Sequence, residues 1–509
     1  MDSLKKRYLY KLSSNSIGMV VGLATQAIIP RGLGPKTYGD YTFLTNFFTE
    51  VVNFLNMGTS FGFYTKLSQR QNEPTLASSY IYFSGLLFFI SIGLILLVHM
   101  SSLAGLFWPD QNIGFVYASA IWGFLTWFAM VFTLMGDAYG LTVTMESIRV
   151  IQKILGLAIV ACLFIFNWLN FTTVISAQYF IWSSLIVSLF LMMEHKGFSL
   201  GKSWRISKVE IRRYFTEYYL YSHPLFVYAL VGLIVGIFDR WLLQLFCGSR
   251  IQGFYGLSYQ IGSFCFLFTN AMTPLLTREF SVTFAEKDFK RMAYLFRRYI
   301  PSLFFIAAFF SCFISVNAEA IIYFIAGPEY AGALVALSLM AFYPIHQTYG
   351  QLSGSVFYAT EQTKLYRNIG IFFKLIGLPI TYLVVAPKEK MGLNAGATGL
   401  AMKMVLIQCL AVNVQLYFNS RFLGLNFWKY IGHQFLSIGL LLVLACIAKF
   451  IVENTLACGS NMLICFLISG FLYTLAVAMM IYFWPVIIGL GREDIDLLVN
   501  RSVQRIFSR

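Results

Sequence analysis

About fourteen apolar runs, each roughly 20 residues long, follow one another along this 509-residue chain. A run of that length is what an α-helix needs to cross the hydrocarbon core of a bilayer. Only 12% of the residues are charged and 58% are hydrophobic, so lipid has to cover surface that a soluble fold would expose to water. The sequence therefore predicts an all-α polytopic membrane protein. The expected helices are centred near residues 22, 52, 89, 124, 161, 182, 235, 267, 310, 344, 377, 407, 440 and 473.

The basic residues are distributed unevenly between alternate loops. With fourteen spans, 28 of the 37 Lys and Arg residues fall in one set of loops, 7 fall in the other set, and two lie within spans. Cytoplasmic loops carry the excess of Lys and Arg in membrane proteins. Both termini are therefore predicted to be cytoplasmic. The protein itself is expected in the cell inner (plasma) membrane. Topology accounts for most of the net charge of +15, and no nucleic-acid partner is predicted.

The chain resembles itself at an offset of 214 residues, which indicates an internal repeat. This offset places Gly34 over Gly248 and Gly39 over Gly253, and it also aligns Tyr41, Phe54, Asn56 and Thr59 with identical residues. Gly34 and Gly39 are expected to bracket a tight outer turn between the first two spans. Six spans in each copy give both copies the same orientation, so we expect two six-helix lobes related by a pseudo-two-fold axis along the membrane normal. Two extra C-terminal helices remain. The predicted divisions are an N-lobe at 1–195, a basic cytoplasmic inter-lobe loop at 196–218, a C-lobe at 219–420, and helices thirteen and fourteen with a cytoplasmic tail at 421–509.

Catalytic signatures are missing from the sequence, so the chain is not predicted to be an enzyme. It contains no HExxH, GxSxG or GxxxxGK[ST] motif, and its five His are far apart in sequence. The eight Cys show no metal spacing and are interpreted as small core residues. The longest polar connections, at 194–218 and 277–298, are too short to form a catalytic domain.

Polar side chains recur at helical spacing inside several spans. On the second span Asn46, Glu50, Asn53 and Ser60 fall within about 80° of one another. Such a face is either a seam between packed helices or the wall of a water-filled cavity. Glu50 favours the cavity, because an acid in mid-membrane costs about 3 kcal/mol or more unless it is solvated or paired. Further candidates for the polar wall are Gln260, Asn270 and Gln347, and Asp239 joins Glu50 as a candidate for ion coupling.

Basic residues within or beside spans are candidates for contact with an anionic substrate. An Arg binds phosphate with two parallel charge-assisted hydrogen bonds, which become stronger in a desolvated cleft. The alternative is snorkelling, in which a long side chain near a helix end extends its charge to the interface. The candidates are Arg31, Lys66, Arg240, Arg278, Lys374 and Lys403.

Four short motifs resemble those of one transporter family. Residues 31–41 (RGLGPKTYGDY), directly after a basic N-terminus and one apolar helix, are similar to the opening of the Wzx-type polysaccharide flippases of the multidrug/oligosaccharidyl-lipid/polysaccharide (MOP) exporter superfamily. The order of GPEY at 327–330, YATEQTK at 358–364 and GLNAGATGLA at 392–401 also resembles that family. The resemblance extends over essentially the whole chain.

The resemblance implies a function. Members of the family move a polyprenyl-diphosphate-linked oligosaccharide from the cytoplasmic to the outer leaflet by alternating access, for cell-surface polysaccharides such as O-antigen. It also implies a cationic cavity in which Arg31 and Arg278 are the first candidates for diphosphate contact, and coupling to H⁺ or Na⁺ through Glu50 or Asp239 with no other cofactor and no metal. The implied partners are the lipid-linked glycan, membrane lipids and polysaccharide assembly proteins. Two alternatives stay open, a cation-coupled antiporter of drugs or organic cations in the same superfamily and a lipid II flippase.

Overall fold

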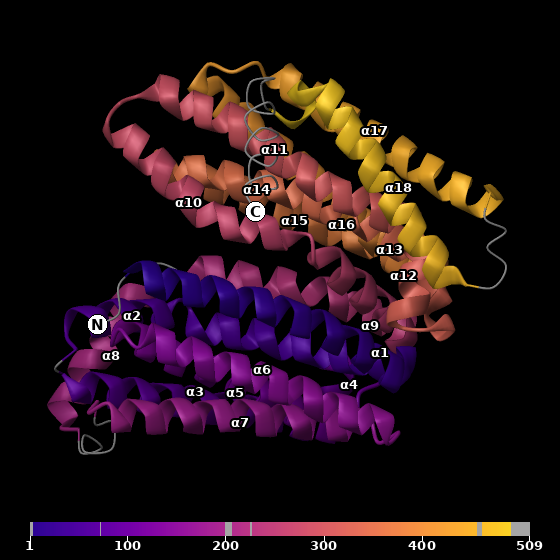
Figure 1. The fold of residues 1–509 in the computed structure, drawn as a ribbon. Helices are drawn as coiled ribbons and strands as arrows, with labels where there is room; N and C mark the ends of the chain where they lie inside the picture. Colours follow the sequence, from indigo (N-terminus) through magenta and orange to yellow (C-terminus); the bar gives the residue numbers. More distant parts are fainter. Residues whose placement is uncertain (1–3, 72, 199–205, 224–225, 456–460, 490–509) are drawn as a thin grey trace, which may run out of the picture. The chain divides into compact units, whose positions relative to one another are not determined.

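Helices make up the regular structure of the described residues, because a backbone in lipid has to satisfy its own hydrogen bonds. The computed structural model describes residues 4–71, 73–198, 206–223, 226–455 and 461–489. Figure 1 labels the α-helices along the chain. They are α1 Leu4–Asn56, α2 Thr59–Gln69, α3 Pro74–Met100, α4 Ala104–Phe107, α5 Ile113–Ala138, α6 Thr142–Ile165, α7 Phe171–His195, α8 Lys208–Ser222, α9 Phe226–Ser263, α10 Phe266–Ala285, α11 Phe289–Val316, α12 Ala318–Ile325, α13 Leu334–Met340, α14 Tyr343–Ala359, α15 Thr363–Val385, α16 Gly396–Leu423, α17 Phe427–Thr455 and α18 Met462–Phe483.

The all-α polytopic membrane fold is confirmed. Within the described ranges, ten helices are long and apolar enough to cross a membrane, namely α3, α5, α6, α7, α9, α11, α15, α16, α17 and α18. The other expected spans, near residues 22, 52, 267 and 344, fall on α1, on the junction of α9 and α10, and on α13 and α14. Three of these four carry the polar stripes, which lower the mean hydropathy of the helix.

The first two expected spans form one kinked helix rather than two helices joined by a turn. Gly34 lies inside the 53-residue helix α1 with φ 69° and ψ 166°, a left-handed φ that favours glycine. Its repeat mate Gly248 breaks α9 in the same way, with φ 74° and ψ 177°. The offset of 214 residues is therefore visible in the backbone, since both copies bend at the matched glycine.

Beyond these kinks, α1 and α9 cross with their backbones in contact. A Cβ atom built on Gly39 would lie 1.8 Å from the carbonyl oxygen of Ser249, and one built on Gly253 would lie 2.0 Å from the carbonyl oxygen of Pro35. Pro35 and Ser249 are themselves 214 residues apart, so the two halves of the contact are repeat mates. Gly39, which was expected in a turn, is instead the residue that permits this close crossing.

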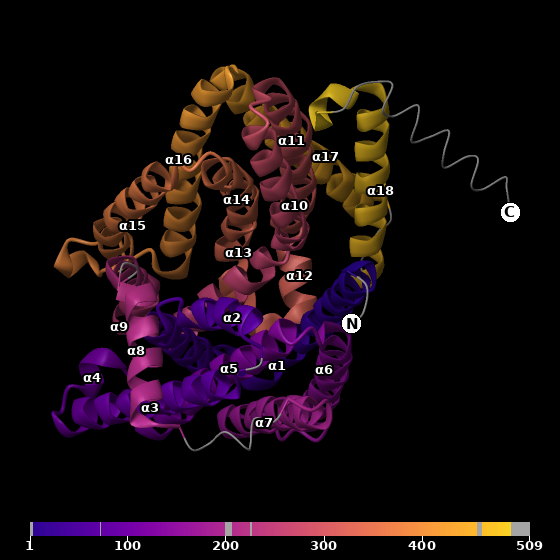
Figure 2. The ribbon, with the colours of Figure 1, turned by 90° about the vertical axis from the view of Figure 1, so that its left-hand side faces the viewer.

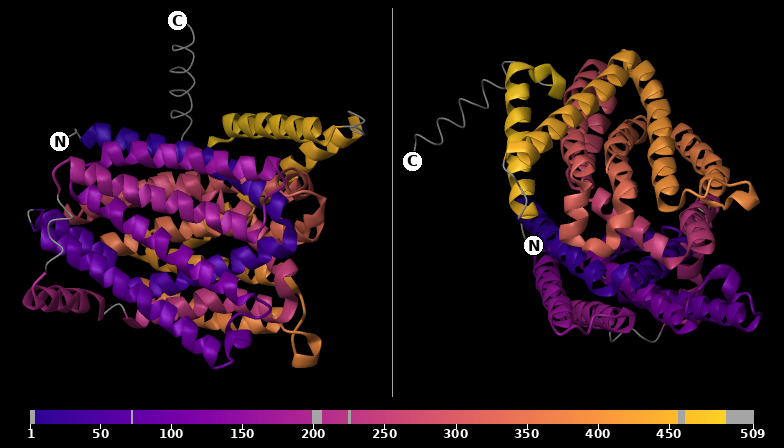
Figure 3. Two further views of the ribbon diagram at one scale, coloured as in Figure 1. Left: turned by 90° about the horizontal axis from the view of Figure 1, so that it is seen from below. Right: turned by 90° about the vertical axis from the view of Figure 1, so that its right-hand side faces the viewer.

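The chain divides into two compact units, Met1–Gly253 and Phe254–Arg509. In the first unit α1 packs on α5 and α6, α5 packs on α7, and the part of α9 before Phe254 adds Ile237 and Trp241 to the core. In the second unit α14 packs between α10 and α16, while α17 packs on α11 and α18. The three views agree that α17 and α18 lie side by side (Figure 3).

The cysteines do not share one environment. Cys265 and Cys312 are buried, as expected of small core residues, whereas Cys162 and Cys446 are exposed. Cys465 is disulfide-bonded. Cys458 lies outside the described residues. The interpretation of all eight as core residues was therefore wrong for several of them, because an exposed residue in a lipid-facing helix can be as apolar as a core residue.

The backbone crossing predicts different effects for two glycines of the same helix. Gly39→Ala places a methyl group on the Ser249 carbonyl and should destabilise the protein by about 1–3 kcal/mol. Gly22→Ala has open space around the new Cβ and should be neutral or slightly stabilising. Thermal unfolding of both purified variants in detergent measures the difference. Equal melting temperatures would contradict the crossing.

Candidate functional site

The polar stripe of α1 faces the first part of α9, within the first unit. A Cβ built on Gly236 of α9 would lie 2.6 Å from the carboxyl carbon of Glu50, so the Glu50 side chain lies directly over this glycine. Two turns before Glu50, the backbone oxygen of Thr42 accepts a hydrogen bond of 3.4 Å from Nη1 of Arg240. These two contacts place the predicted candidates Glu50 and Arg240 on one seam between α1 and α9.

Asp239 adds a second acid to the same stretch of α9. It is 9% exposed, whereas the adjacent Arg240 is half-buried. Both acids and the guanidinium engage in electrostatic or hydrogen-bonding interactions. Glu50 on α1 and Asp239 and Arg240 on α9 thus place two carboxylates and one guanidinium in apolar helices, where each charge is costly unless it is paired or hydrated. Such a set can exchange a proton or a small cation against a bound ligand.

Asn46 and Asn53 occupy different environments on this seam. Asn46 lies one turn from Thr42 and one turn from Glu50, and its Oδ1 atom is buried with no hydrogen-bond partner among the described residues. A buried amide oxygen without a partner costs about 1–3 kcal/mol, which water or a ligand group would offset. Asn53, one turn beyond Glu50, is exposed.

A second polar seam lies in the second unit, around α14. The Nε2 of Gln408 on α16 donates to Oε1 of Gln347, which connects a predicted wall residue to a neighbouring helix. Thr348 hydrogen-bonds Thr269 of α10 at 2.9 Å. His346 is 8% exposed, and within the described part of the chain its Nδ1 lacks a partner, as does the buried Oε1 of Gln351.

The remaining predicted wall residues are less informative. Gln260 is half-buried in the part of α9 that belongs to the second unit, and it makes a polar interaction. The side chain of Asn270 lies outside the described residues. The structure therefore connects Gln347 to a polar seam and leaves the roles of Gln260 and Asn270 as predictions.

The basic candidates of the second unit differ sharply in burial. Lys403 of α16 is 6% exposed, and a Cβ built on Gly377 of α15 would lie 3.3 Å from its Nζ atom. A lysine that packs its ammonium beside a glycine inside a helix pair does not fit the snorkelling interpretation. Lys374, one turn before Gly377, is exposed. Arg278 on α10 is 76% exposed and pairs with Glu279 at 3.0 Å.

In the first unit, Arg31 is exposed on α1 before the kink and makes a polar interaction. Lys66 on α2 forms an ion pair with Glu217 of α8. That pair gives Lys66 a structural partner, although contact with a substrate stays a prediction.

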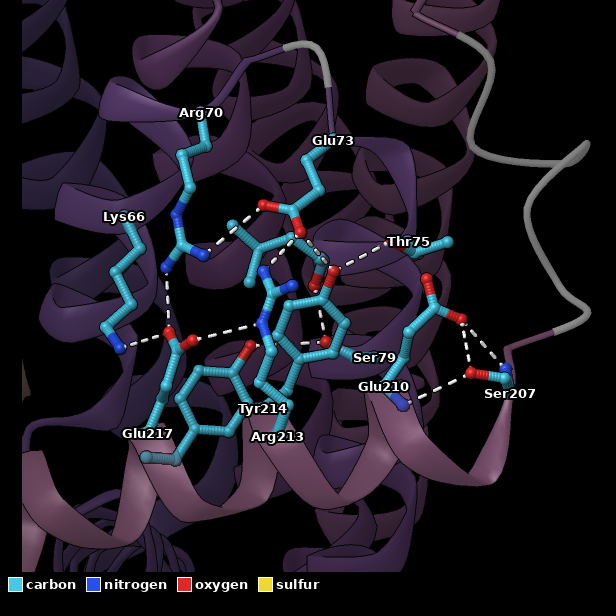
Figure 4. Close-up of polar contacts among 12 residues, drawn as sticks. Lys66, Arg70, Glu73, Thr75, Ser79, Ser207, Glu210, Arg213, Tyr214 and Glu217 are labelled. Atoms are coloured by element: carbon cyan, nitrogen blue, oxygen red, sulfur yellow. Dashed lines mark hydrogen bonds and ion pairs between the residues drawn. The ribbon is translucent and has the colours of Figure 1, made fainter.

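Lys66 belongs to an ion-pair network between α8 and the turn that joins α2 to α3 (Figure 4). Glu217 also pairs with Arg70 at 2.7 Å, and Arg213 pairs with Glu73 at 2.5 Å. In this network the positive side chains surround the two carboxylates of Glu73 and Glu217. The Tyr214 hydroxyl also donates a hydrogen bond of 2.7 Å to Glu73. It fixes α8 to the helices of the first unit.

One buried acid was not among the predicted site residues. Glu146 in the first turns of α6 is 1% exposed, and its Oε1 accepts a hydrogen bond of 2.9 Å from Nη1 of Arg149. Its Oε2 has no partner among the residues that the structure describes. The i, i+3 spacing of an acid and an arginine at the start of a span was the available signal. No group of three or more His, Cys, Asp or Glu that could hold a metal ion occurs in the described ranges.

The network predicts a pH dependence centred on Glu217. Burial raises the pKa of this carboxyl. Hydrogen bonds and charges from Arg70 and Lys66 lower the pKa by a larger amount, so its value is about 2, against an ordinary 4.5. The ion pairs therefore stabilise the folded protein fully above pH 4.5, and their contribution is lost as the pH falls toward about 2.

Glu217→Gln should accordingly reduce stability at pH 7 by about 1 kcal/mol, a value that allows for solvent screening. The difference from the unsubstituted protein should shrink as the pH falls below 4.5. Thermal unfolding across this range measures it, with Glu453→Gln as a control, because Glu453 is exposed and lies 3.8 Å from Lys449. A difference between the two proteins that is as large at pH 2.5 as at pH 7 would contradict the assignment.

Comparisons with known proteins agree with the two-unit helical fold. The fold of the lipid II flippase MurJ in its inward closed conformation matches with a TM-score of 0.68 at 13% identity, over 93% of this chain and 99% of that chain. An inward-facing multidrug resistance MATE family transporter of the MOP superfamily matches with a TM-score of 0.63 at 15% identity, over 80% and 94%. A MOP superfamily transporter from Pyrococcus furiosus, described with a binding pocket of reverse polarity, matches with a TM-score of 0.53 at 14% identity, over 82% and 95%.

At these identities the structural likeness shows the fold alone. No curated protein matches the sequence. Residues 4–277 match the family model described as polysaccharide biosynthesis protein, which covers more than half of the chain. The chain therefore belongs to the polysaccharide biosynthesis protein family, a Wzx-like family of MOP-superfamily transporters rather than enzymes.

Proposed function

We propose that this transporter is a flippase that moves a polyprenyl-diphosphate-linked oligosaccharide from the cytoplasmic to the outer leaflet by alternating access. The observation that carries the proposal is the charged seam between α1 and α9 in a member of a polysaccharide biosynthesis family. A glycan and a diphosphate are too polar to enter hydrocarbon, whereas the lipid tail can stay in the bilayer. A transporter for such a molecule needs hydrated polar surfaces inside apolar helices.

The residues divide this task by chemistry. Arg240, together with Arg31, Arg278 and Lys403, supplies cations for the diphosphate, because guanidinium and ammonium groups form charge-assisted bonds with phosphate oxygens. Asn46 and Gln347 supply amides for sugar hydroxyls. Glu50 and Asp239 are the groups that couple movement to H⁺ or Na⁺, since an acid in an apolar helix gains or loses a cation as its surroundings change.

A second candidate function is a cation-coupled antiporter of drugs or organic cations. The observation that favours it is a pair of acids in apolar helices, Glu50 beside Gly236 of α9 and the nearly buried Asp239 on α9 itself. An organic cation would pair with these carboxylates, whereas a diphosphate would be repelled by them and attracted to Arg240. A lipid II flippase is the third candidate, and it differs from the first only in the glycan carried.

Cells that lack the protein distinguish these functions. The pool of lipid-linked glycan is scored by leaflet with a non-permeant sugar-modifying reagent. Under the first proposal, intermediates accumulate on the cytoplasmic side, and re-expression relieves the accumulation. Arg240→Glu should fail to relieve it while still inserting in the membrane, because the reversed charge repels the diphosphate. An unchanged pool with altered sensitivity to cationic drugs would select the antiporter, and accumulation of lipid II would select the third candidate.

The position of Glu50 gives a sharper test of the seam. Gly236→Ala places a methyl group 2.6 Å from the Glu50 carboxyl carbon and forces that side chain away from α9. Gly232→Ala, one turn earlier on the same helix, has open space around the new Cβ. We expect Gly236→Ala to reduce glycan export at least tenfold at equal membrane abundance, and Gly232→Ala to leave it unchanged. Equal export by both variants would exclude a role for the placement of Glu50.

A further inference from the structure

The inner face of α8 is held at the start of a membrane span. The Tyr214 hydroxyl contacts Thr75 at 2.8 Å, and the Tyr218 hydroxyl contacts Ser79 at 3.3 Å. The ring of Phe215 packs edge-on against Phe83, with centroids 5.5 Å apart. The candidate span of α3 begins at Thr75.

These contacts give the depth of α8. Residues 75 to 83 of α3 extend about 12 Å along the helix axis, at about 1.5 Å per residue. Contacts of Arg213 and Tyr214 with Glu73 lie at the polar start of α3, and contacts of Phe215 and Tyr218 lie up to two turns further in. The helix α8, which lies beside α3 in Figure 2, therefore occupies the interface between water and hydrocarbon. It also ends only a few residues before α9, which is a candidate span itself.

The outer face of α8 has the composition that suits this depth. At 100° per residue, the side opposite Tyr214 and Tyr218 carries Val209, Arg212, Thr216, Tyr219 and Leu220, with Lys208 at its edge. Val209, Tyr219 and Leu220 are 79%, 67% and 60% exposed. Both cations lie in the half of α8 near the polar start of α3, and Tyr219 and Leu220 lie in the half that is deeper. The two acids of α8, Glu210 and Glu217, are not on this face.

We propose that this outer face of α8 binds the headgroups of anionic lipids. Lys208 and Arg212 lie at the level of the headgroups, where a basic residue gains from the negative leaflet surface. Tyr219 and Leu220 cover the boundary of the acyl chains, as aromatic and aliphatic residues do in interfacial helices. The ion pairs with Glu73 and Arg70 engage Arg213 and Glu217, which flank this face on one side, and Lys208 and Arg212 stay exposed. The proposal is independent of the substrate that the transporter carries.

Depth is tested with a nitroxide side chain introduced by a bioorthogonal amino acid at residue 220 of the full chain in lipid nanodiscs. The lipid reference is the same label at Phe89, which is 71% exposed in mid-α3, and the aqueous reference is Lys287 in the turn after α10. We expect the label at 220 to be relaxed by oxygen in preference to a water-soluble nickel chelate, as at Phe89. If the nickel chelate relaxes the label at 220 more than oxygen does, as at Lys287, the proposal is overturned. The outer face of α8 would then be exposed to water, where a soluble partner could bind.

Headgroup selectivity is tested with spin-labelled phosphatidylglycerol and phosphatidylcholine in the same nanodiscs. The variant K208Q/R212Q should lower the preference of the protein for phosphatidylglycerol in its motionally restricted lipid shell at least twofold. The control variant K388Q/K390Q removes the same charge from an exposed turn before α16 and should leave the preference unchanged. Equal preferences in all three proteins would overturn the assignment of Lys208 and Arg212 to anionic headgroups.

Discussion

Hydrocarbon offers no hydrogen-bond partner to a backbone or to a polar side chain, and the rest of this structure depends on that constraint. It explains why the described residues form helices and why so few residues are charged. It also means that a polar side chain inside a span has to face another helix or water. The contacts of Glu50 with Gly236 and of Gln347 with Gln408 follow this rule. Glu50 and Gln347, which we propose as transport residues, therefore also lie where helices meet.

The repeat gives the polar seam of the first unit its geometry. Gly34 and Gly248 bend α1 and α9 at matched positions, and Gly39 and Gly253 then allow the bent segments to cross with their backbones in contact. Close approach of this kind is available only where a helix lacks a side chain. Asp40 follows Gly39 and hydrogen-bonds Ser249 at 2.5 Å, which adds a polar contact to the crossing. The seam with Glu50 and Arg240 begins directly beyond this point along α1.

The charged residues of the first unit have two kinds of role. Arg70, Arg213 and Lys66 neutralise Glu73 and Glu217, and this network attaches α8 to α2 and α3. Glu50 and Arg240 lie instead on the seam between α1 and α9, and Asp239 precedes Arg240 on α9. Charge alone does not separate the two roles, since Lys66 and Arg240 are equally basic in the sequence. The contacts in the fold do, because Lys66 pairs with Glu217, whereas Nη1 of Arg240 donates to the backbone oxygen of Thr42 on another helix.

The sequence by itself determined the membrane class, the positions of the helices, the repeat offset and the family, because each depends on composition, on periodicity or on short motifs along the chain. It also identified Glu50, Asp239 and Arg240 as unusual in apolar surroundings. Only the tertiary structure decided that Lys66 pairs with Glu217, that Gly39 is a crossing point rather than part of a turn, and that Glu146 is buried. The physical reason is that helical periodicity shows which residues of one helix share a face, whereas the partner of that face comes from a helix far away in sequence.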